Sequence, residues 1–259
     1  MQIATWNINS LTVRLPQVLV WLEANPVDAL CLQELKLTDE KFPFDALKAA
    51  GYEAAAFGQK TYNGVAILSR SPLTDVARNM PGFDDVQARV IAGTLDSPQG
   101  PVRVINGYFV NGQAPDSDKF VYKLKWLQAL QDMVRAEMAQ HERLVLVGDF
   151  NVAPDDRDTY DPVGLAGTIH HTPEERGHFQ ALLELGLTDA YRLFDQAEKS
   201  FTWWDYRMLG FQKNRGMRID HILVSDALKP AVQACTIDRA PRKNPQPSDH
   251  APVVVRLAL

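Results

Sequence analysis

The sequence predicts an α/β protein in which mixed β-sheets carry helices on their outer faces. Short apolar segments rich in valine and isoleucine alternate along the chain with longer segments whose apolar residues recur at helical spacing. Residues 62–110 add several candidate strands in succession, as a mixed sheet requires. The chain has 259 residues, 46% apolar and 23% charged, and no repeat or linker divides it. We therefore expect one domain over residues 1–259.

Each element follows from its apolar period and from the turn residues that bound it. Strands are predicted at 2–8, 28–35, 64–70, 88–96, 101–110, 144–150, 218–225 and 251–259, and helices at 15–25, 118–140 and 172–186. The last helix has the clearest boundaries. Thr172 is its N-cap, Pro173 its first residue, Glu175 completes a capping box, and Gly186 follows its end.

Composition narrows the class of protein. Cys31 and Cys235 are far apart in sequence and form no disulfide framework, which favours the reducing cytoplasm. The N-terminal residues have no signal-peptide pattern, and no segment is long and apolar enough to cross a membrane. The net charge of −5 counts mildly against general nucleic-acid binding, but it leaves room for a basic strip along one groove.

The segment "LVLVGDFN" ends a predicted core strand in a carboxylate and a carboxamide. Asp149 and Asn151 are two residues apart, so on an extended chain both side chains face the same side. A turn cap is the alternative interpretation, because Asp and Asn both favour turns.

Other strand ends carry comparable groups. They are Asn7 and Asn9, Glu34, the set Asn106, Tyr108 and Asn111, Asp220, and Asp249 with His250. Each alone has a structural explanation, but strands of one sheet system can bring their ends together. Asp220 lies between Ile219 and Ile222 in a predicted core strand, so its carboxylate must be paired or functional.

These residue types suit one chemistry. The carboxylates of Glu34, Asp149 and Asp249 offer the oxygen ligands that Mg²⁺ or Mn²⁺ prefers, and the lack of a Cys/His cluster argues against zinc. An Asp–His pair can keep an imidazole cationic beside a phosphate. The amides of Asn7 and Asn151 can orient water or ligands. The set predicts metal-assisted hydrolysis of a phosphodiester or a phosphomonoester.

Six motifs occur in order along the chain: "TWNINS", "LCLQELK", "GYFVNG", "GDFN", "RIDHILVS" and "SDHAPV". Together they resemble the exonuclease III family of DNA-repair nucleases, which includes abasic-site endonucleases and belongs to the endonuclease/exonuclease/phosphatase superfamily. The resemblance runs from residue 1 to residue 259. It implies a four-layer α-β-β-α sandwich of two packed mixed sheets with outer helices.

The resemblance also implies roles for site residues. Mg²⁺, for which Mn²⁺ can substitute, is expected at a set comprising Asn7, Glu34, Asp149, Asn151, Asp249 and His250. Asp149 is expected to activate or position the attacking water, and Asn151 to orient the phosphate or that water. His250, paired with Asp220, is expected to bind the scissile phosphate, and Tyr108 to contact the phosphate or leaving group.

Residues 201–218 favour a nuclease over a phosphatase, because in DNA-repair members this region supplies an aromatic pocket and basic phosphate contacts. The expected substrate contacts are Asn9, Asn111, Trp203, Trp204, Arg207, Met217 and Arg218. Neighbouring strand residues face opposite ways, so we expect one of Trp203 and Trp204 to pack inward and the other to face the site.

The loop before the last helix departs from the pattern of abasic endonucleases, which often have a small residue and an aromatic there. This chain has His170 and His171. Two surface histidines are one interpretation. The other is that an imidazole narrows the pocket, which would favour trimming of a frayed 3′ end over cleavage at a flipped abasic site.

The leading hypothesis is a Mg²⁺-dependent repair nuclease, monomeric, acting on duplex DNA at 3′ ends and at abasic sites. A phosphatase acting on a small or lipid phosphoester is the second hypothesis. A non-catalytic DNA-binding relative is the third.

Overall fold

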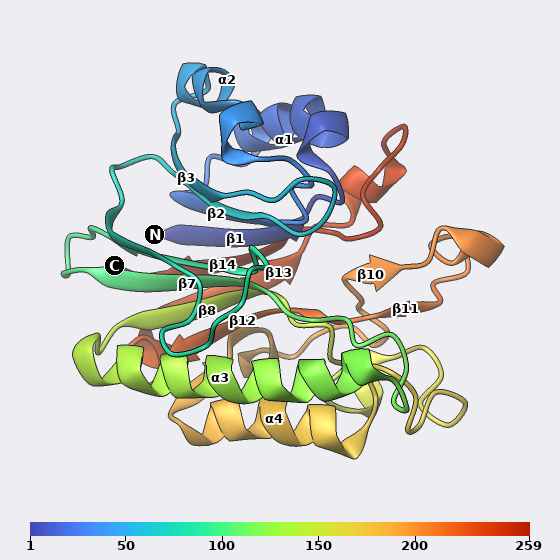
Figure 1. The fold of residues 1–259 in the computed structure, drawn as a ribbon. Helices are drawn as coiled ribbons and strands as arrows, with labels where there is room; N and C mark the ends of the chain where they lie inside the picture. Colours follow the sequence, from blue (N-terminus) through green and yellow to red (C-terminus); the bar gives the residue numbers. More distant parts are fainter.

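Two six-stranded sheets pack face to face between layers of helices in the computed structural model, which describes residues 1–259 (Figure 1). The first sheet runs in the order β13 (Val232–Ile237), β14 (Val253–Leu257), β1 (Gln2–Asn7), β2 (Ala29–Gln33), β4 (Val65–Ser69) and β3 (Glu53–Phe57). The second runs in the order β5 (Thr74–Arg78), β6 (Val90–Leu95), β7 (Val102–Tyr108), β8 (Leu144–Asp149), β12 (Asp220–Ser225) and β9 (Leu187–Asp189). A separate ribbon pairs β10 (Trp203–Trp204) with β11 (Gly216–Met217).

Four α-helices cover the outer faces of the sheets. They are α1 (Leu11–Ala24) and α2 (Phe44–Ala49) on the first sheet, and α3 (Asp118–Gln140) and α4 (Pro173–Glu184) on the second (Figure 1). The capping box of Thr172 and Glu175 at the start of α4 is present as predicted. The predicted four-layer α-β-β-α sandwich is therefore confirmed. None of the helices is long and apolar enough to cross a bilayer.

The apolar core has three large clusters, and the one between the two sheets joins them. Ile3 and Cys31 of the first sheet pack in one cluster with Val104, Val145 and Ile222 of the second. Strands buried on both faces show a nearly continuous apolar sequence, which explains why the central strands were predictable. Because the shared cluster leaves no separable half, we infer that residues 1–259 form one domain.

The predicted elements are all present, but the structure adds several and shifts one. Strands β3, β5 and β13 lie at sheet edges and are partly exposed, so their apolar pattern is weak. The alanine-rich sequence of β3 favours helix over strand on local propensity. Helix α1 begins at Leu11 instead of Leu15 and includes Pro16, whose missing N–H leaves one intrahelical bond unmade.

Strand direction brings the polar strand ends together. β1 and β2 are parallel, and so are β7 and β8, so each pair delivers its last residues to the same edge. β12 is antiparallel to β8 and places Asp220 opposite Asp149. Just behind this edge, Gln33 Nε2 donates to Asn106 Oδ1 at 2.7 Å and ties the first sheet to the second.

Candidate active site

Asp149 lies at the centre of the edge where the polar strand ends of the two sheets meet. Gly148 precedes it at φ 144°, and a Cβ there would meet the Gly107 carbonyl oxygen at 1.9 Å, so only glycine fits. Asp149 Oδ1 accepts from the Asn151 amide at 3.0 Å, and Oδ2 accepts from Asn7 Nδ2 at 2.9 Å. The carboxylate therefore caps its turn with one oxygen and presents the other to the site, which combines both interpretations of the "GDFN" segment.

A buried Asp–His pair faces Asp149. Nδ1 of His250 lies 2.9 Å from Asp220 Oδ2, and Nε2 lies 3.7 Å from Asp149 Oδ2. Burial alone would lower the pKa of His250, but Asp220 and Asp149 raise that pKa to about 10. The imidazole is therefore cationic at neutral pH. The predicted role of His250 as a metal ligand stays a prediction: a ring nitrogen lies near the Glu34 and Asp149 oxygens, but the imidazole would have to lose a proton to offer a lone pair.

The same environment shifts Asp149. Burial raises the pKa of Asp149 to about 7, with the cationic His250 opposing the rise and Asp220 adding to it. A carboxylate with a pKa near neutrality can accept a proton from water far better than an ordinary exposed one.

Glu34 faces Asp149 across the site. One oxygen of Glu34, one of Asp149 and a ring nitrogen of His250 all lie within 4.8 Å of one another. Asn7 Nδ2 donates to Glu34 Oε1 at 2.9 Å, and Lys36 Nζ lies 3.0 Å from Glu34 Oε2. Two converging carboxylates, each contacted by a cation or an N–H donor, are a donor set that fits a hard divalent cation.

Two other residues of the predicted metal set, Asn7 and Asp249, have different partners. Asn7 turns its amide nitrogen to the carboxylates and accepts from the Asn9 amide through Oδ1 at 3.0 Å. Asp249 accepts from Asn9 Nδ2 and from Trp203 Nε1, each at 2.9 Å, and lies outside the group. Burial would raise the pKa of Asp249, but His250 and these donors lower it. Asp249 thus anchors the β10–β11 ribbon to the site.

Asn151 and Tyr108 complete the centre. Asn151 Nδ2 donates to the Phe109 carbonyl at 3.0 Å, and its Oδ1 accepts from Asn111 Nδ2 at 3.2 Å. Burial, followed by the charges of Glu34 and Asp149, raises the pKa of Tyr108 well above its usual value. The Tyr108 hydroxyl therefore stays protonated and can act as a donor.

A cavity of about 410 Å³ lies beside the centre, under the β10–β11 ribbon. It is lined by thirteen residues that include His170, His171, Trp203, Arg207, Arg215 and Met217. Trp203 is half-buried at this cavity, whereas Trp204 is completely buried against Phe211. One tryptophan faces the site and one the interior, as expected from alternation.

Arg218 is a correction to the predicted substrate contacts. Its side chain is 2% exposed, and its guanidinium lies 2.6 Å from Asp158 and 2.8 Å from Asp189. The same group donates to His221 Nδ1 at 3.0 Å. A guanidinium paired on every side in the interior cannot reach DNA, so Arg218 supports the fold beneath the pocket.

The interpretation of His170 and His171 as surface histidines is wrong, because both side chains are buried. His170 and His171 are 7% and 4% exposed. His170 Nδ1 lies 2.6 Å from the Asn151 carbonyl oxygen, and burial, followed by the charge of Lys123, lowers the pKa of His170 to about 3. A neutral imidazole of His170 therefore forms part of the cavity wall and contacts the catalytic loop.

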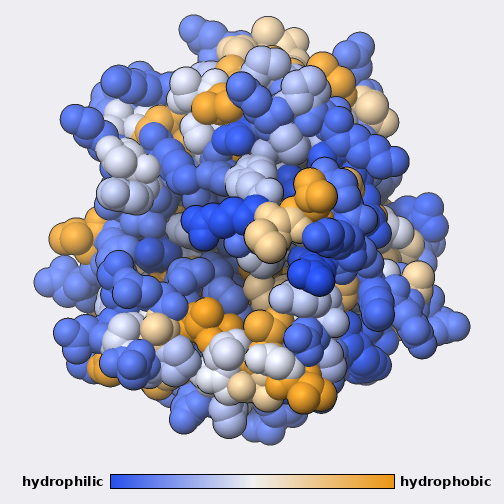
Figure 2. Space-filling model, turned by 90° about the vertical axis from the view of Figure 1, so that its right-hand side faces the viewer, coloured by the Kyte–Doolittle hydropathy of each residue, from blue (hydrophilic) through white to orange (hydrophobic).

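The exposed apolar tip of the ribbon was not predicted from the sequence. Met208 and Leu209 are 75% and 58% exposed, and both have a left-handed backbone, with φ of 57° and 58°. Figure 2 shows this side of the molecule as mainly hydrophilic, with scattered hydrophobic groups. Met208 also lines the cavity of about 410 Å³, so the apolar tip reaches the edge of that cavity.

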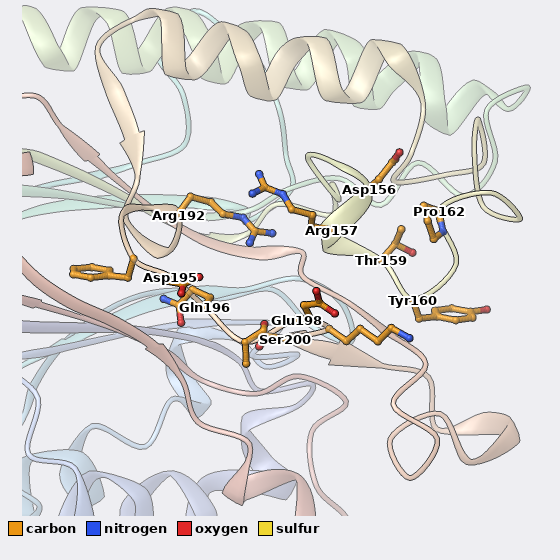
Figure 3. Close-up of a pocket in the computed structure, with 13 residues that line it drawn as sticks. Asp156, Arg157, Thr159, Tyr160, Pro162, Arg192, Asp195, Gln196, Glu198 and Ser200 are labelled. Carbon is orange, nitrogen blue, oxygen red and sulfur yellow. Dashed lines mark hydrogen bonds between the residues drawn. The ribbon is translucent and has the colours of Figure 1, made fainter.

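A second cavity, of about 420 Å³, lies next to the first, and Tyr160 lines both. Figure 3 shows Arg157 and Arg192 on one wall and Asp195 and Glu198 on the opposite wall. It contains none of the groups described above. The chemistry therefore belongs to the joined sheet edge and to the cavity at His170.

Converging carboxylates with a cationic Asp–His pair define the class of metal-assisted phosphoester hydrolases. A profile of the endonuclease/exonuclease/phosphatase family matches residues 4–250, and the chain belongs to that family. It is 36% identical to exodeoxyribonuclease III of Haemophilus influenzae, with 98% of each chain covered.

Solved structures agree with this assignment. The 3′ phosphatase NExo from Neisseria, bound to a product DNA hairpin, superposes with a TM-score of 0.97 at 51% identity, with 100% of each chain covered. An AP endonuclease from Archaeoglobus fulgidus superposes with a TM-score of 0.94 at 34% identity, again over 100% of each chain.

Proposed function

We propose that this protein is a metal-dependent DNA-repair nuclease that hydrolyses phosphodiesters in duplex DNA. The observation that carries the proposal is the convergence of Glu34 and Asp149 on the Asp220–His250 pair, beside a cavity of aromatic and basic residues. The names of the similar proteins, an exodeoxyribonuclease III, a 3′ phosphatase and an AP endonuclease, support action on damaged or terminal DNA.

The residues divide the reaction among them. Asp149 accepts the proton of the attacking water, and Asn151 orients that water or the phosphate. His250, held cationic by Asp220, stabilises the negative charge that develops on the phosphate. The protonated hydroxyl of Tyr108 donates to the phosphate or the leaving oxygen.

Mg²⁺ is the proposed metal, with Mn²⁺ as a substitute, because the donor set consists of carboxylate oxygens. Glu34 and Asp149 would hold it. A bound cation supplies Lewis-acid polarisation of the phosphate and stabilises developing charge.

Duplex DNA with 3′ ends or abasic sites is the proposed substrate, bound by a monomer whose site face stays open. Trp203 and Met217 form an apolar wall for a displaced sugar, while Arg207 and Arg215 contact backbone phosphates without sequence preference. Met208 and Leu209 would press against the bases as an apolar wedge. Because the cysteines are free and buried, we place the protein in a reducing compartment, the cytoplasm.

Metal removal tests the proposal. With EDTA, cleavage of a duplex carrying a recessed 3′ end is expected to stop, and Mg²⁺ or Mn²⁺ should restore it, because the carboxylate pair alone cannot polarise the phosphate. Inositol phosphates, assayed in parallel, should not be hydrolysed. Full DNA cleavage in EDTA would contradict the metal role, and hydrolysis of inositol phosphates alone would favour a phosphatase.

We also propose that His170 narrows the pocket and favours 3′-end trimming over abasic cleavage. The ring lines the cavity, and its Nδ1–H donates to the Asn151 carbonyl, so the side chain is fixed in place. His171 lines the same cavity, held by Nδ1 at 3.0 Å from the Ile169 carbonyl. A flipped abasic sugar needs more room than a frayed 3′ terminus.

Replacing His170 with glycine is expected to raise abasic cleavage relative to 3′ trimming by about tenfold, a typical magnitude for steric discrimination. Glycine suits this position because His170 has φ 72°, so the variant opens the pocket without backbone strain. The ratio of kcat/KM on an abasic duplex and on a recessed 3′ end gives the result. His171→Gly is the second test, and His178→Ala, outside the cavity, is the control. An unchanged ratio for both loop variants would rule out steric gating.

A further inference from the structure

A buried ion pair lies next to the loops that carry Asn151 and His170. Lys123 comes from α3 and Glu175 from α4, the side chains contact each other, and both are 0% exposed. None of the proposed chemical steps uses either residue. A fully buried pair of opposite charges at this place therefore needs another explanation.

Lys123 binds backbone carbonyls in two loops of the site, those of Asn151 and Asn111. Its Nζ donates to the Asn151 carbonyl at 2.7 Å and to the Asn111 carbonyl at 3.2 Å, as well as to Glu175. Asn111 in turn donates through its side chain to Asn151 Oδ1. The ammonium group thus uses its three donors on two site loops and one counter-charge.

Glu175 holds the histidine loop in the same way. Oε1 accepts from the His170 amide at 3.0 Å, and Oε2 accepts from the Thr172 amide at 3.1 Å and hydroxyl at 2.8 Å. The capping box of α4 accounts for the contacts with Thr172, but not for those with His170 and Lys123. Glu175 therefore serves the loop as well as the helix.

The loops at Asn151 and His170 also need such restraint. Asn151 and His170 both have left-handed backbones, with φ of 51° and 72°, which non-glycine residues adopt at an energetic cost. The Asn151 carbonyl receives both Lys123 Nζ and His170 Nδ1. Strained conformations persist where surrounding contacts over-determine them, and here the ion pair supplies those contacts.

Stability alone does not explain the pair. Removing two charges from water costs about as much as their attraction returns, so buried ion pairs are often replaceable by neutral residues without loss of stability. Removing only one partner is different, because it leaves an uncompensated buried charge. Stability and position can therefore be separated by experiment.

We propose that Lys123 and Glu175 are positioning residues that fix Asn151 at the catalytic centre and His170 at the pocket, and so set both the rate and the choice of DNA substrate. The proposal rests on the proposed nuclease function. Lys123 and Glu175 would act through the loops at Asn151 and His170, since neither side chain is exposed to substrate.

The test uses the double variant Lys123→Met with Glu175→Gln, in the full chain with Mg²⁺. We expect Lys123→Met alone to lower the melting temperature more than the double variant does. The single variant leaves the Glu175 charge buried without a partner, whereas the double variant buries no unpaired charge. We expect kcat on a recessed 3′ end to fall roughly 100-fold from the displaced Asn151, with little change in KM. The ratio of abasic to 3′ cleavage should also rise, because the His170 loop is released.

Arg103→Met with Glu137→Gln is the matched control. This ion pair also involves α3, which it joins to β7 of the second sheet, with Arg103 4% exposed and Nε 2.6 Å from Glu137 Oε2, but it contacts no site loop. The control should leave kcat and the substrate ratio unchanged, whatever its melting temperature. Lys123→Arg, which keeps the charge and the donors, should retain more activity than Lys123→Met.

The outcomes are distinguishable. A Lys123/Glu175 double variant with unaltered kcat and unaltered substrate ratio would overturn the positioning role, and so would equal losses in the Arg103/Glu137 control. If the double variant does not fold, Lys123→Met decides, assayed at a temperature at which circular dichroism shows it folded: a changed substrate ratio supports the role, and an unchanged ratio with unaltered kcat overturns it. Failure of the unaltered protein to cleave either duplex would instead reject the nuclease function.

Discussion

Replacing Asp149 with asparagine is expected to lower kcat for DNA cleavage by about 10²- to 10⁴-fold, the usual contribution of a positioned general base. Asparagine can keep the hydrogen bond from the Asn151 backbone amide through its one carbonyl oxygen, so the turn should hold its shape, but its amide nitrogen cannot accept from Asn7 Nδ2. It cannot accept a proton from water. The loss should therefore appear in kcat, measured in single turnover, with little change in DNA affinity.

Asp156→Asn is the control for this variant, since Asp156 is an exposed carboxylate on the following loop, 71% exposed, and should leave kcat unchanged. Glu34→Gln distinguishes the two roles of the carboxylates. It should raise the Mg²⁺ concentration needed for half-maximal rate, because it removes a charged ligand and leaves the base in place. If Asp149→Asn were fully active at saturating Mg²⁺, another group would have to be the base.

Replacing His250 with glutamine is expected to lower kcat by about 10²- to 10³-fold, as the removal of one donor to developing oxyanion charge does elsewhere. The pH profile gives an independent readout. Asp149 acts only when deprotonated, so kcat rises with pH through the pKa of Asp149, which burial raises to about 7. A bound divalent cation lowers that pKa and moves the rise to lower pH.

His250 acts only when protonated, so kcat should fall as pH rises through its pKa, which Asp220 and Asp149 raise to about 10 against the effect of burial. His250→Gln should lose this alkaline limb and keep the acid limb. His178→Gln, on the outer helix α4, should keep both. If the alkaline limb survives in His250→Gln, another group must cause that limb, and the cationic role of His250 would be rejected.

Much of the fold could be predicted because its central strands are buried on both faces. Residues 144–147 and 222–224 are unbroken apolar runs, and local turn signals bound the strands that contain them. The edge strands β3, β5 and β13 could not be found in the same way. Their side chains are partly exposed, and only pairing with a neighbouring strand, remote in sequence for β13, makes them strands.

Several site residues could also be predicted from local sequence, but the contacts between them could not. Asp149 and Asn151 share a strand end, and a carboxylate such as Asp220 within an apolar strand must have a partner. The identity of that partner, His250, followed from the family resemblance, and the structure shows the two side chains in contact. Local spacing alone could not have paired residues 30 positions apart.

The amino-acid sequence by itself determined the residue types, the strand ends that carry them and the family, because these depend on local period and on ordered motifs. Only the tertiary structure decided which charges face substrate and which face one another. Arg207 and Arg218 belong to the same basic segment, yet Arg207 lines the cavity and Arg218 is buried between Asp158 and Asp189. Burial and pairing depend on contacts between remote segments, and these decide whether a charge is available for binding.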